Sequence, residues 1–174
     1  MRLTWLLMLL LVLPGLATAH GPSRKSVKTE VTINAGAETV WALIKDFCSI
    51  AAWNPGVSAC VAASPDQPQT IRTVTLADGQ TLEEKLTRIS PETMRIQYTL
   101  VKSNADSLPV RTMGSIMTVI PAADGTSTLQ YKAAFYRAYP GMDPPPELND
   151  DACARAITAL YEPGLNNIKK LAEQ

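Results

Sequence analysis

The amino-acid sequence predicts an α+β fold, with about seven antiparallel strands, two short helices after the first strand, and one long C-terminal helix. The middle of the chain, residues 57–136, is a succession of short segments with strand character. Asp78-Gly79 and Asp124-Gly125 lie between consecutive segments, where such dipeptides favour tight hairpins. The last 25 or so residues instead place apolar side chains at helical spacing. A chain of 174 residues can bury one core but is too short for two independent ones.

The first 19 residues have the three-part pattern of a secretory signal peptide. Arg2 gives a basic start, a leucine-rich run follows, and Ala17-Thr18-Ala19 supplies the small residues that a signal peptidase requires. We therefore expect cleavage between Ala19 and His20 and a periplasmic mature protein. An uncleaved membrane anchor is the alternative, but the apolar run is shorter than the roughly 20 residues that a spanning helix needs. No later stretch resembles a transmembrane helix, so we expect no membrane span in the mature chain.

The remaining elements follow from residue patterns in chain order. We expect residues 20–25 to be polar and flexible, and residues 26–174 to form the single folded domain. Residues 26–34 alternate apolar and polar side chains, which predicts a half-buried strand. Residues 37–47 change to helical spacing, and a second short helical turn ends before Trp53-Asn54-Pro55-Gly56. Six further strands are predicted at residues 57–62, 70–77, 80–89, 93–101, 113–120 and 127–136.

The C-terminal helix has recognisable start and end signals. Three consecutive prolines, 144–146, favour an extended connector before it. Asn149 is the expected N-cap, followed by two aspartates, and two lysines near the other end suit the helix dipole. Pro163 removes one backbone hydrogen bond, so we expect a kink there but not two separate helices.

The three cysteines, Cys48, Cys60 and Cys153, would be in an oxidising compartment after export. Cys48 and Cys60 flank a short compact stretch, and we predict a disulfide between them; three buried thiols are the alternative. A disulfide closing so short a loop contributes on the order of 3 kcal/mol. Cys153 would then be left over on the final helix, packed in the interior.

The order of these elements resembles the START-like superfamily, also called SRPBCC, which includes polyketide cyclases, dehydratases and lipid-transfer domains. The residues that carry the resemblance are Val31 to Ala35 leading to Val40-Trp41, Asp46-Phe47 followed by Trp53-Asn54-Pro55, Glu84-Lys85-Leu86, Leu108-Pro109-Val110, and Ala134 to Arg137 through Glu147 to Asp150. Many relatives have His in place of Asn54 and Arg in place of Lys85. The resemblance implies a helix-grip fold, in which a curved sheet wraps around the long C-terminal helix and leaves an apolar cavity.

Within that superfamily, the signal peptide makes the chain most similar to periplasmic methanol-oxidation accessory proteins of MxaD type. The resemblance implies a helper of a periplasmic methanol dehydrogenase or of its cytochrome, not a catalyst. It covers nearly all of the mature chain, but fold alone does not determine function.

The candidate site residues are inward-facing side chains of the predicted cavity. Glu84 shares a strand face with Leu82 and Leu86, so its carboxylate would be costly to ionise without a cationic partner. Arg72, Arg95, Lys132 and Arg137 are the candidate partners. Together with Glu84, we expect the cavity to be lined by Tyr98, Met113, Met117, Tyr131, Phe135, Ile157 and Tyr161. Core packing would explain most of these apolar side chains equally well.

Composition and motifs exclude several classes of function. Lys plus Arg and Asp plus Glu number 16 each, so there is no basic excess for nucleic acid. The only histidine, His20, lies at the expected mature N-terminus, which rules out histidine-dependent triads within the domain and most zinc sites. We therefore expect no metal and no cofactor.

Three functions fit the sequence. The first, which we favour, is a non-enzymatic periplasmic protein that binds a small hydrophobic molecule or assists the methanol dehydrogenase system. The second is a cyclase or dehydratase that uses Glu84 with Tyr98 or Tyr131 as proton carriers. The third is a lipid or quinone shuttle.

Overall fold

A computed structural model describes residues 21–103 and 108–174. The predicted signal peptide, its cleavage point and His20 lie outside these ranges. In the described part of the chain, no helix combines the length and the apolar character needed to cross a bilayer.

The sheet contains seven strands, as predicted, and every neighbouring pair is antiparallel. The strand order is β1-β7-β6-β5-β4-β3-β2, so only the pairing of β1 with β7 joins strands distant in sequence. The strands are β1 (Lys25–Ile33), β2 (Val57–Ala62), β3 (Ile71–Leu76), β4 (Thr81–Ser90), β5 (Arg95–Lys102), β6 (Val110–Pro121) and β7 (Ser127–Arg137).

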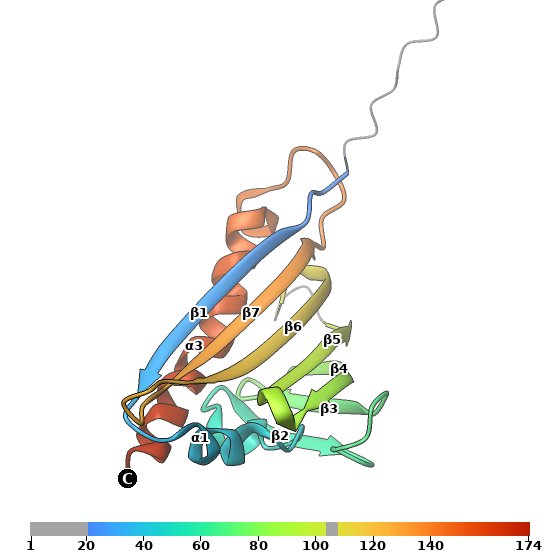
Figure 1. The fold of residues 1–174 in the computed structure, drawn as a ribbon. Coiled ribbons are helices and arrows are strands. Elements are labelled where there is room, and N and C mark those ends of the chain that lie inside the picture. The colour runs from blue at the N-terminus through green and yellow to red at the C-terminus, as the bar shows by residue number, and fades with distance from the viewer. Residues whose placement is uncertain (1–20, 104–107) are drawn as a thin grey trace, which may run out of the picture.

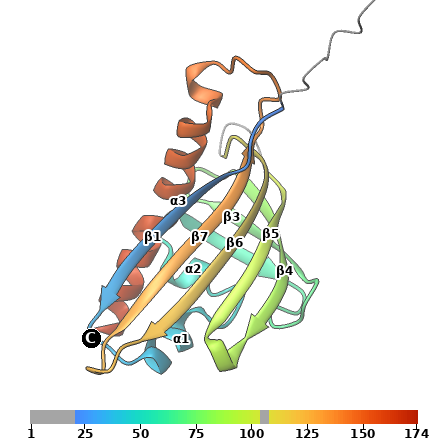
Figure 2. The same cartoon turned by 45° about the horizontal axis from the view of Figure 1, so that its top comes forward.

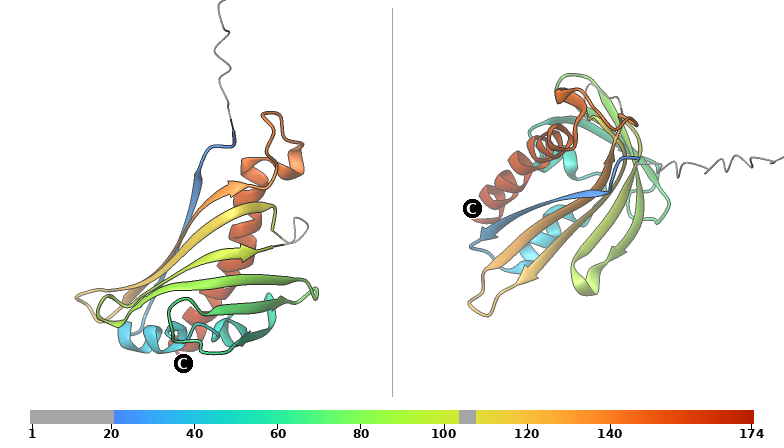
Figure 3. Two further views of the ribbon diagram at one scale, coloured as in Figure 1. Left: turned by 90° about the vertical axis from the view of Figure 1, so that its right-hand side faces the viewer. Right: turned by 90° about the horizontal axis from the view of Figure 1, so that it is seen from above.

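The described residues also form three α-helices and two short 3-10 helices. These are α1 (Ala37–Ile44), α2 (Ile50–Trp53), η1 (Pro91–Thr93), η2 (Pro146–Leu148) and α3 (Asp150–Ala172). The sheet bends around α3, and the two short helices α1 and α2 lie near one end of the curve. This arrangement confirms the predicted helix-grip fold (Figures 1, 2 and 3). Lys25, which we placed in the flexible N-terminal segment, instead begins β1 and pairs with Phe135.

The long helix α3 starts and continues as the sequence predicts. The Asn149 side chain accepts a hydrogen bond from the Ala152 backbone N–H at 2.8 Å, which is the N-cap interaction. The helix continues through Pro163 as one element. Gly164 is required by close packing, because a Cβ added there would lie 2.6 Å from a ring carbon of Trp53 on α2. Side-chain amides of Asn54 and Asn167 also bond across this contact, to the carbonyls of Leu160 and Trp53.

The disulfide between Cys48 and Cys60 is present, which confirms that prediction. It ties the segment between α1 and α2 to β2, the edge strand of the sheet. Cys153 is buried and unpaired, also as predicted, and its thiol lies 2.9 Å from the carbonyl oxygen of Pro109.

Candidate functional site

An ion pair between Arg72 and Glu84 lies inside the molecule, between the sheet and α3. Arg72 on β3 is directly opposite Glu84 on β4, and their side chains are only 3% and 1% exposed. Glu84 Oε2 accepts hydrogen bonds from Arg72 Nε at 2.9 Å and from Nη2 at 2.6 Å. Such burial is tolerated only when the charges are paired and hydrogen-bonded. Of the four candidate partners for Glu84, the fold therefore selects Arg72.

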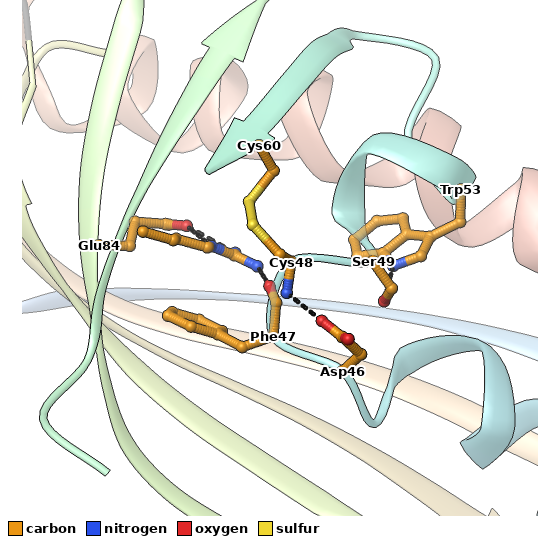
Figure 4. The surroundings of a disulfide bond; sticks show 8 residues. Asp46, Phe47, Cys48, Ser49, Trp53, Cys60 and Glu84 are labelled. Atoms are coloured by element: carbon orange, nitrogen blue, oxygen red, sulfur yellow. Dashed lines mark hydrogen bonds and ion pairs between the residues drawn. A yellow bond between two sulfur atoms is a disulfide. The ribbon is translucent and has the colours of Figure 1, made fainter. Parts of the chain in front are cut away.

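Two further segments attach to this pair. The Tyr161 hydroxyl of α3 donates to the other carboxylate oxygen, Glu84 Oε1, at 2.8 Å. Arg72 Nη1 donates to the backbone carbonyl of Phe47, the residue that precedes disulfide-bonded Cys48. The guanidinium also lies 4.0 Å from the centre of the Phe47 ring, within cation–π range. Figure 4 shows Phe47 and Glu84 converging beside the disulfide. The cluster thus joins sheet, helix and disulfide-bonded corner.

A second group of polar side chains lies beside the ion pair. The rings of Tyr131 and Tyr161 stack at 4.2 Å, and the Tyr131 hydroxyl is 3.1 Å from the Ser115 hydroxyl. The Tyr98 ring lies 5.7 Å from Phe47 and 4.9 Å from the Arg72 guanidinium carbon. Tyr98 is 2% exposed, and its hydroxyl makes no well-aligned hydrogen bond within the described ranges. The Tyr161 and Ser115 hydroxyls lie near enough to lower its pKa, but they bond to Glu84 and Tyr131.

Burial determines the protonation of these groups. Desolvation raises the pKa of Tyr98, Tyr131 and Tyr161 above the usual value, and the nearby Glu84 carboxylate raises each one further. Desolvation alone would lower the pKa of Arg72, but the adjacent Glu84 carboxylate raises it above its usual value. At neutral pH the three phenols are therefore uncharged hydrogen-bond donors, and Arg72 is a fixed cation.

All eight predicted cavity residues lie in one buried cluster between the sheet and α3: Glu84, Tyr98, Met113, Met117, Tyr131, Phe135, Ile157 and Tyr161. Their shared interior location was predictable from strand and helix periodicity. The enzyme alternative, with Glu84 and Tyr98 or Tyr131 as proton carriers, stays a prediction, and the phenol that bonds to the carboxylate is Tyr161. The sequence reasoning also missed the Phe47 carbonyl, since backbone contacts leave no signal in residue type.

The predicted cavity itself stays a prediction. Three hollows of about 620, 490 and 670 Å³ are lined by described residues. They lie at the start of α3, on the outer face of the sheet, and between α1 and the end of β4. None of the three is lined by Glu84, Tyr131 or Tyr161. Among the described residues there is also no group of three His, Cys, Asp or Glu side chains arranged to hold a metal ion.

Comparison with known proteins identifies the class. The polyketide cyclase/dehydrase and lipid transport family matches residues 24–173, and the chain belongs to this family. The fold is that of START-like proteins. No curated protein matches the sequence.

Solved structures share the fold at low sequence identity. XoxI from Bacillus cereus is 20% identical with a TM-score of 0.72, covering 84% of this chain and 94% of its own. Norcoclaurine synthase from Thalictrum flavum, solved in complex with dopamine and hydroxybenzaldehyde, is 16% identical with a TM-score of 0.68 and 95% coverage of both chains. Ara h 8.0201 is 16% identical with a TM-score of 0.68, covering 86% of this chain and 98% of its own.

Proposed function

We propose that this chain is an exported, non-enzymatic START-like protein that binds a small hydrophobic molecule between its sheet and α3. The observation that carries the proposal is the Tyr98 hydroxyl, which is buried beside the Arg72–Glu84 pair without a well-aligned hydrogen bond, because the neighbouring Tyr161 and Ser115 hydroxyls bond elsewhere. A buried polar group without a partner costs about 1–3 kcal/mol. A ligand that offers an acceptor to Tyr98 would recover that cost, and the surrounding Met113, Met117 and Phe135 would contact its apolar part.

The electrostatics of the interior favour a neutral ligand. Arg72 and Glu84 already neutralise each other, and both carboxylate oxygens are bonded. The three buried phenols stay protonated at neutral pH. A charged ligand would therefore have no unpaired counter-charge in this cluster, whereas a ketone, ester, ether or quinone oxygen would suit the Tyr98 donor.

The same features weigh against acid–base catalysis. A general base must accept a proton from the substrate, but Glu84 is held by an arginine that stays charged and by Tyr161. A cyclase or dehydratase using Glu84 is the alternative. In that case Glu84→Gln would abolish turnover of an aromatic polyketide while leaving its affinity mostly intact.

For the biological role, we propose assistance to a periplasmic methanol dehydrogenase or its cytochrome. The support is the resemblance to MxaD-type proteins, the signal sequence, and a disulfide, which is typical of exported proteins. Adding the purified protein to that enzyme and cytochrome should raise the rate of methanol-dependent cytochrome reduction. An unchanged rate would reject the accessory role. Bound lipid or quinone detected by native mass spectrometry would instead favour a shuttle.

Ligand binding is tested with two naphthalenes of similar shape, 2-acetonaphthone and 2-ethylnaphthalene, followed by tryptophan fluorescence. Only the ketone carries an acceptor for Tyr98, so we expect it to bind about 5- to 10-fold more tightly, as one added hydrogen bond implies. Tyr98→Phe should abolish this preference. Tyr136→Phe is the matched control, because Tyr136 is 38% exposed on the outer face. Equal binding of both compounds to the native protein, or no binding, would contradict the proposal.

A further inference from the structure

A groove of about 490 Å³ crosses the outer face of the sheet, opposite the face that holds α3. Two rows of outward-facing residues line it, and within each row the residues lie directly opposite one another on adjacent strands. One row is Ser26, Ala134, Gly114 and Thr99; the other is Lys28, Lys132, Ile116 and Gln97. The groove therefore runs across β1, β7, β6 and β5, which Figure 1 shows side by side. Its volume is in the range of small-molecule sites.

The charge around this groove has one sign. Three cationic residues line it, Arg24, Lys28 and Lys132, and no carboxylate does. Lys28 and Lys132 are directly opposite each other in the β1–β7 register, where like charges destabilise a sheet. Glu30 lies just outside the groove and pairs with Lys28 at 2.8 Å. Within the described ranges, Lys132 and Arg24 have no ion pair. One carboxylate, Glu30, thus faces both lysines and has its pKa lowered by Lys28 and also by Lys132, so the three cations keep a net positive charge at this point.

The groove is open above Gly114. A Cβ added at this position would meet no atom within 4 Å, so the space above the backbone is empty. Ile116 and Ala134 add apolar surface beside it, and the side chains of Thr99 and Gln97 add hydrogen-bonding groups. An occupant would thus meet cations at the β1–β7 end and a mainly apolar, partly polar floor toward β5.

We propose that this groove is a second ligand site, which binds a small organic anion: a carboxylate or sulfonate attached to an apolar body. The anionic group would bind at Lys132, which has no ion pair of its own among the described residues whereas Lys28 is paired with Glu30, and the apolar body would extend over Gly114 and Ile116. Tyr98, Ser115 and Ala133 also line the groove, but residues that alternate along a strand face opposite sides of the sheet, and the Tyr98 ring packs in the interior against Phe47. The site is therefore separate from the interior one. The volume of about 490 Å³ favours a small molecule over a protein surface.

The test uses 8-anilinonaphthalene-1-sulfonate, whose fluorescence rises on binding, and its neutral counterpart N-phenyl-1-naphthylamine, which lacks only the sulfonate. We expect Lys132→Gln to weaken binding of the sulfonate several-fold and to leave binding of the neutral amine unchanged. Gly114→Val should also weaken sulfonate binding, because a Cβ at this position meets no atom within 4 Å, the larger side chain occupies the open space, and valine is favoured in strands. Lys170→Gln, an exposed lysine on α3, is the matched control and should have no effect.

Competitors identify the occupant. Octanoate should displace the sulfonate. Raised salt should weaken the binding of octanoate and of the sulfonate, because exposed charges are screened. Displacement by hexaglutamate but not by octanoate would show a polypeptide site and overturn the proposal. Loss of binding in Lys132→Gln but not in Gly114→Val would indicate only a basic surface, and would also overturn it. Sulfonate binding that is lost in Tyr98→Phe and retained in both outer-face variants would assign the probe to the interior and reject the second site.

Discussion

Two arginine–carboxylate pairs occupy different environments in this fold. Arg72 and Glu84 lie in the interior, with side chains 3% and 1% exposed, and the Tyr161 hydroxyl connects their carboxylate to the middle of α3. Arg137 at the end of β7 pairs with Asp150 in the first turn of α3, at 3.1 Å, with side chains 8% and 26% exposed. Both pairs connect the sheet to the same helix, one at its centre and one at its start.

The two pairs contain the same kinds of charge but differ in how far their carboxylates are exposed to solvent. The interior pair has lost its water, so each charge depends on the other and on the groups that bond to it. At the rim, Asp150 keeps contact with solvent and has a second cation, Lys25, at 3.7 Å. The interior pair should therefore be costly to break from either side. At the rim Arg137 is buried but also donates to the Gly141 carbonyl, so removing the more exposed Asp150 charge should cost about as much as losing a surface interaction.

The largest expected effect comes from breaking the interior pair. Arg72→Met leaves the Glu84 carboxylate buried without its counter-charge, so we expect the free energy of unfolding to fall by about 3–5 kcal/mol. Urea unfolding followed by tryptophan fluorescence measures this loss. The double variant Arg72→Met/Glu84→Gln should lose much less than the sum of the two single variants, because no uncompensated charge remains and Gln can still accept from Tyr161.

The control for this prediction is Glu83→Gln, on the outer face of the same strand. Glu83 is 37% exposed, and its ion pair with Lys102 is long, at 3.8 Å. Loss of the Glu83 charge should therefore change the free energy of unfolding by less than about 1 kcal/mol. If Arg72→Met were as mild as Glu83→Gln, the distinction between interior and exposed pairs would be wrong for this molecule.

A second prediction concerns alkaline pH. The folded state raises the pKa of Tyr98, Tyr131 and Tyr161, whereas in the unfolded chain each titrates near 10. Their contribution is complete below about pH 10 and is lost as pH rises, because the unfolded state releases these protons first. Between pH 10 and 11 we expect a loss of about 1 kcal/mol for each phenol, about 3 kcal/mol together.

Urea unfolding at pH 9, 10 and 11 measures this slope. Tyr131→Phe should flatten it by about one third of the phenol contribution, since one of three buried groups no longer titrates. Asp150→Asn, at the rim, should leave the slope unchanged. Early ionisation of all three tyrosines in the native protein, detected by absorbance at 295 nm before unfolding, would contradict the prediction.

Local patterns in the sequence were sufficient to predict the strands, the helices and the inward direction of Glu84, whereas the helix-grip arrangement came from the resemblance to START-like proteins. The period of two along residues 80–89 places Leu82, Glu84 and Leu86 on one face, and all three are buried. Asp78-Gly79 predicted a hairpin, and Gly79 has the positive φ of 84° that such a turn requires. These features depend on residues close together in the chain.

The details of the site depend on contacts between distant residues. The choice of Arg72 among four possible partners required the β3–β4 register, and the approach of Tyr161 required the position of α3 relative to the sheet, 77 residues away from Glu84. The irregular start of β6 was missed because it also depends on pairing with a distant strand. Strand β6 begins at Val110, three residues before the predicted start, and its pairing with β7 is irregular between Val110 and Thr112.

The smallest effect is expected at the rim. Asp150→Asn removes the charge that pairs with Arg137 and Lys25, and also a favourable charge at the start of α3. We expect the free energy of unfolding to fall by about 1 kcal/mol in low salt, and by less in 1 M NaCl because the exposed charges are screened. Asp151→Asn is the matched control: Asp151 is exposed in the same helical turn and has no ion pair within the described ranges, so only the dipole contribution is lost. A salt-independent loss of several kcal/mol in Asp150→Asn would mean that the rim pair depends on its partners as strongly as Arg72 and Glu84 do, and that exposure is not what separates the two pairs.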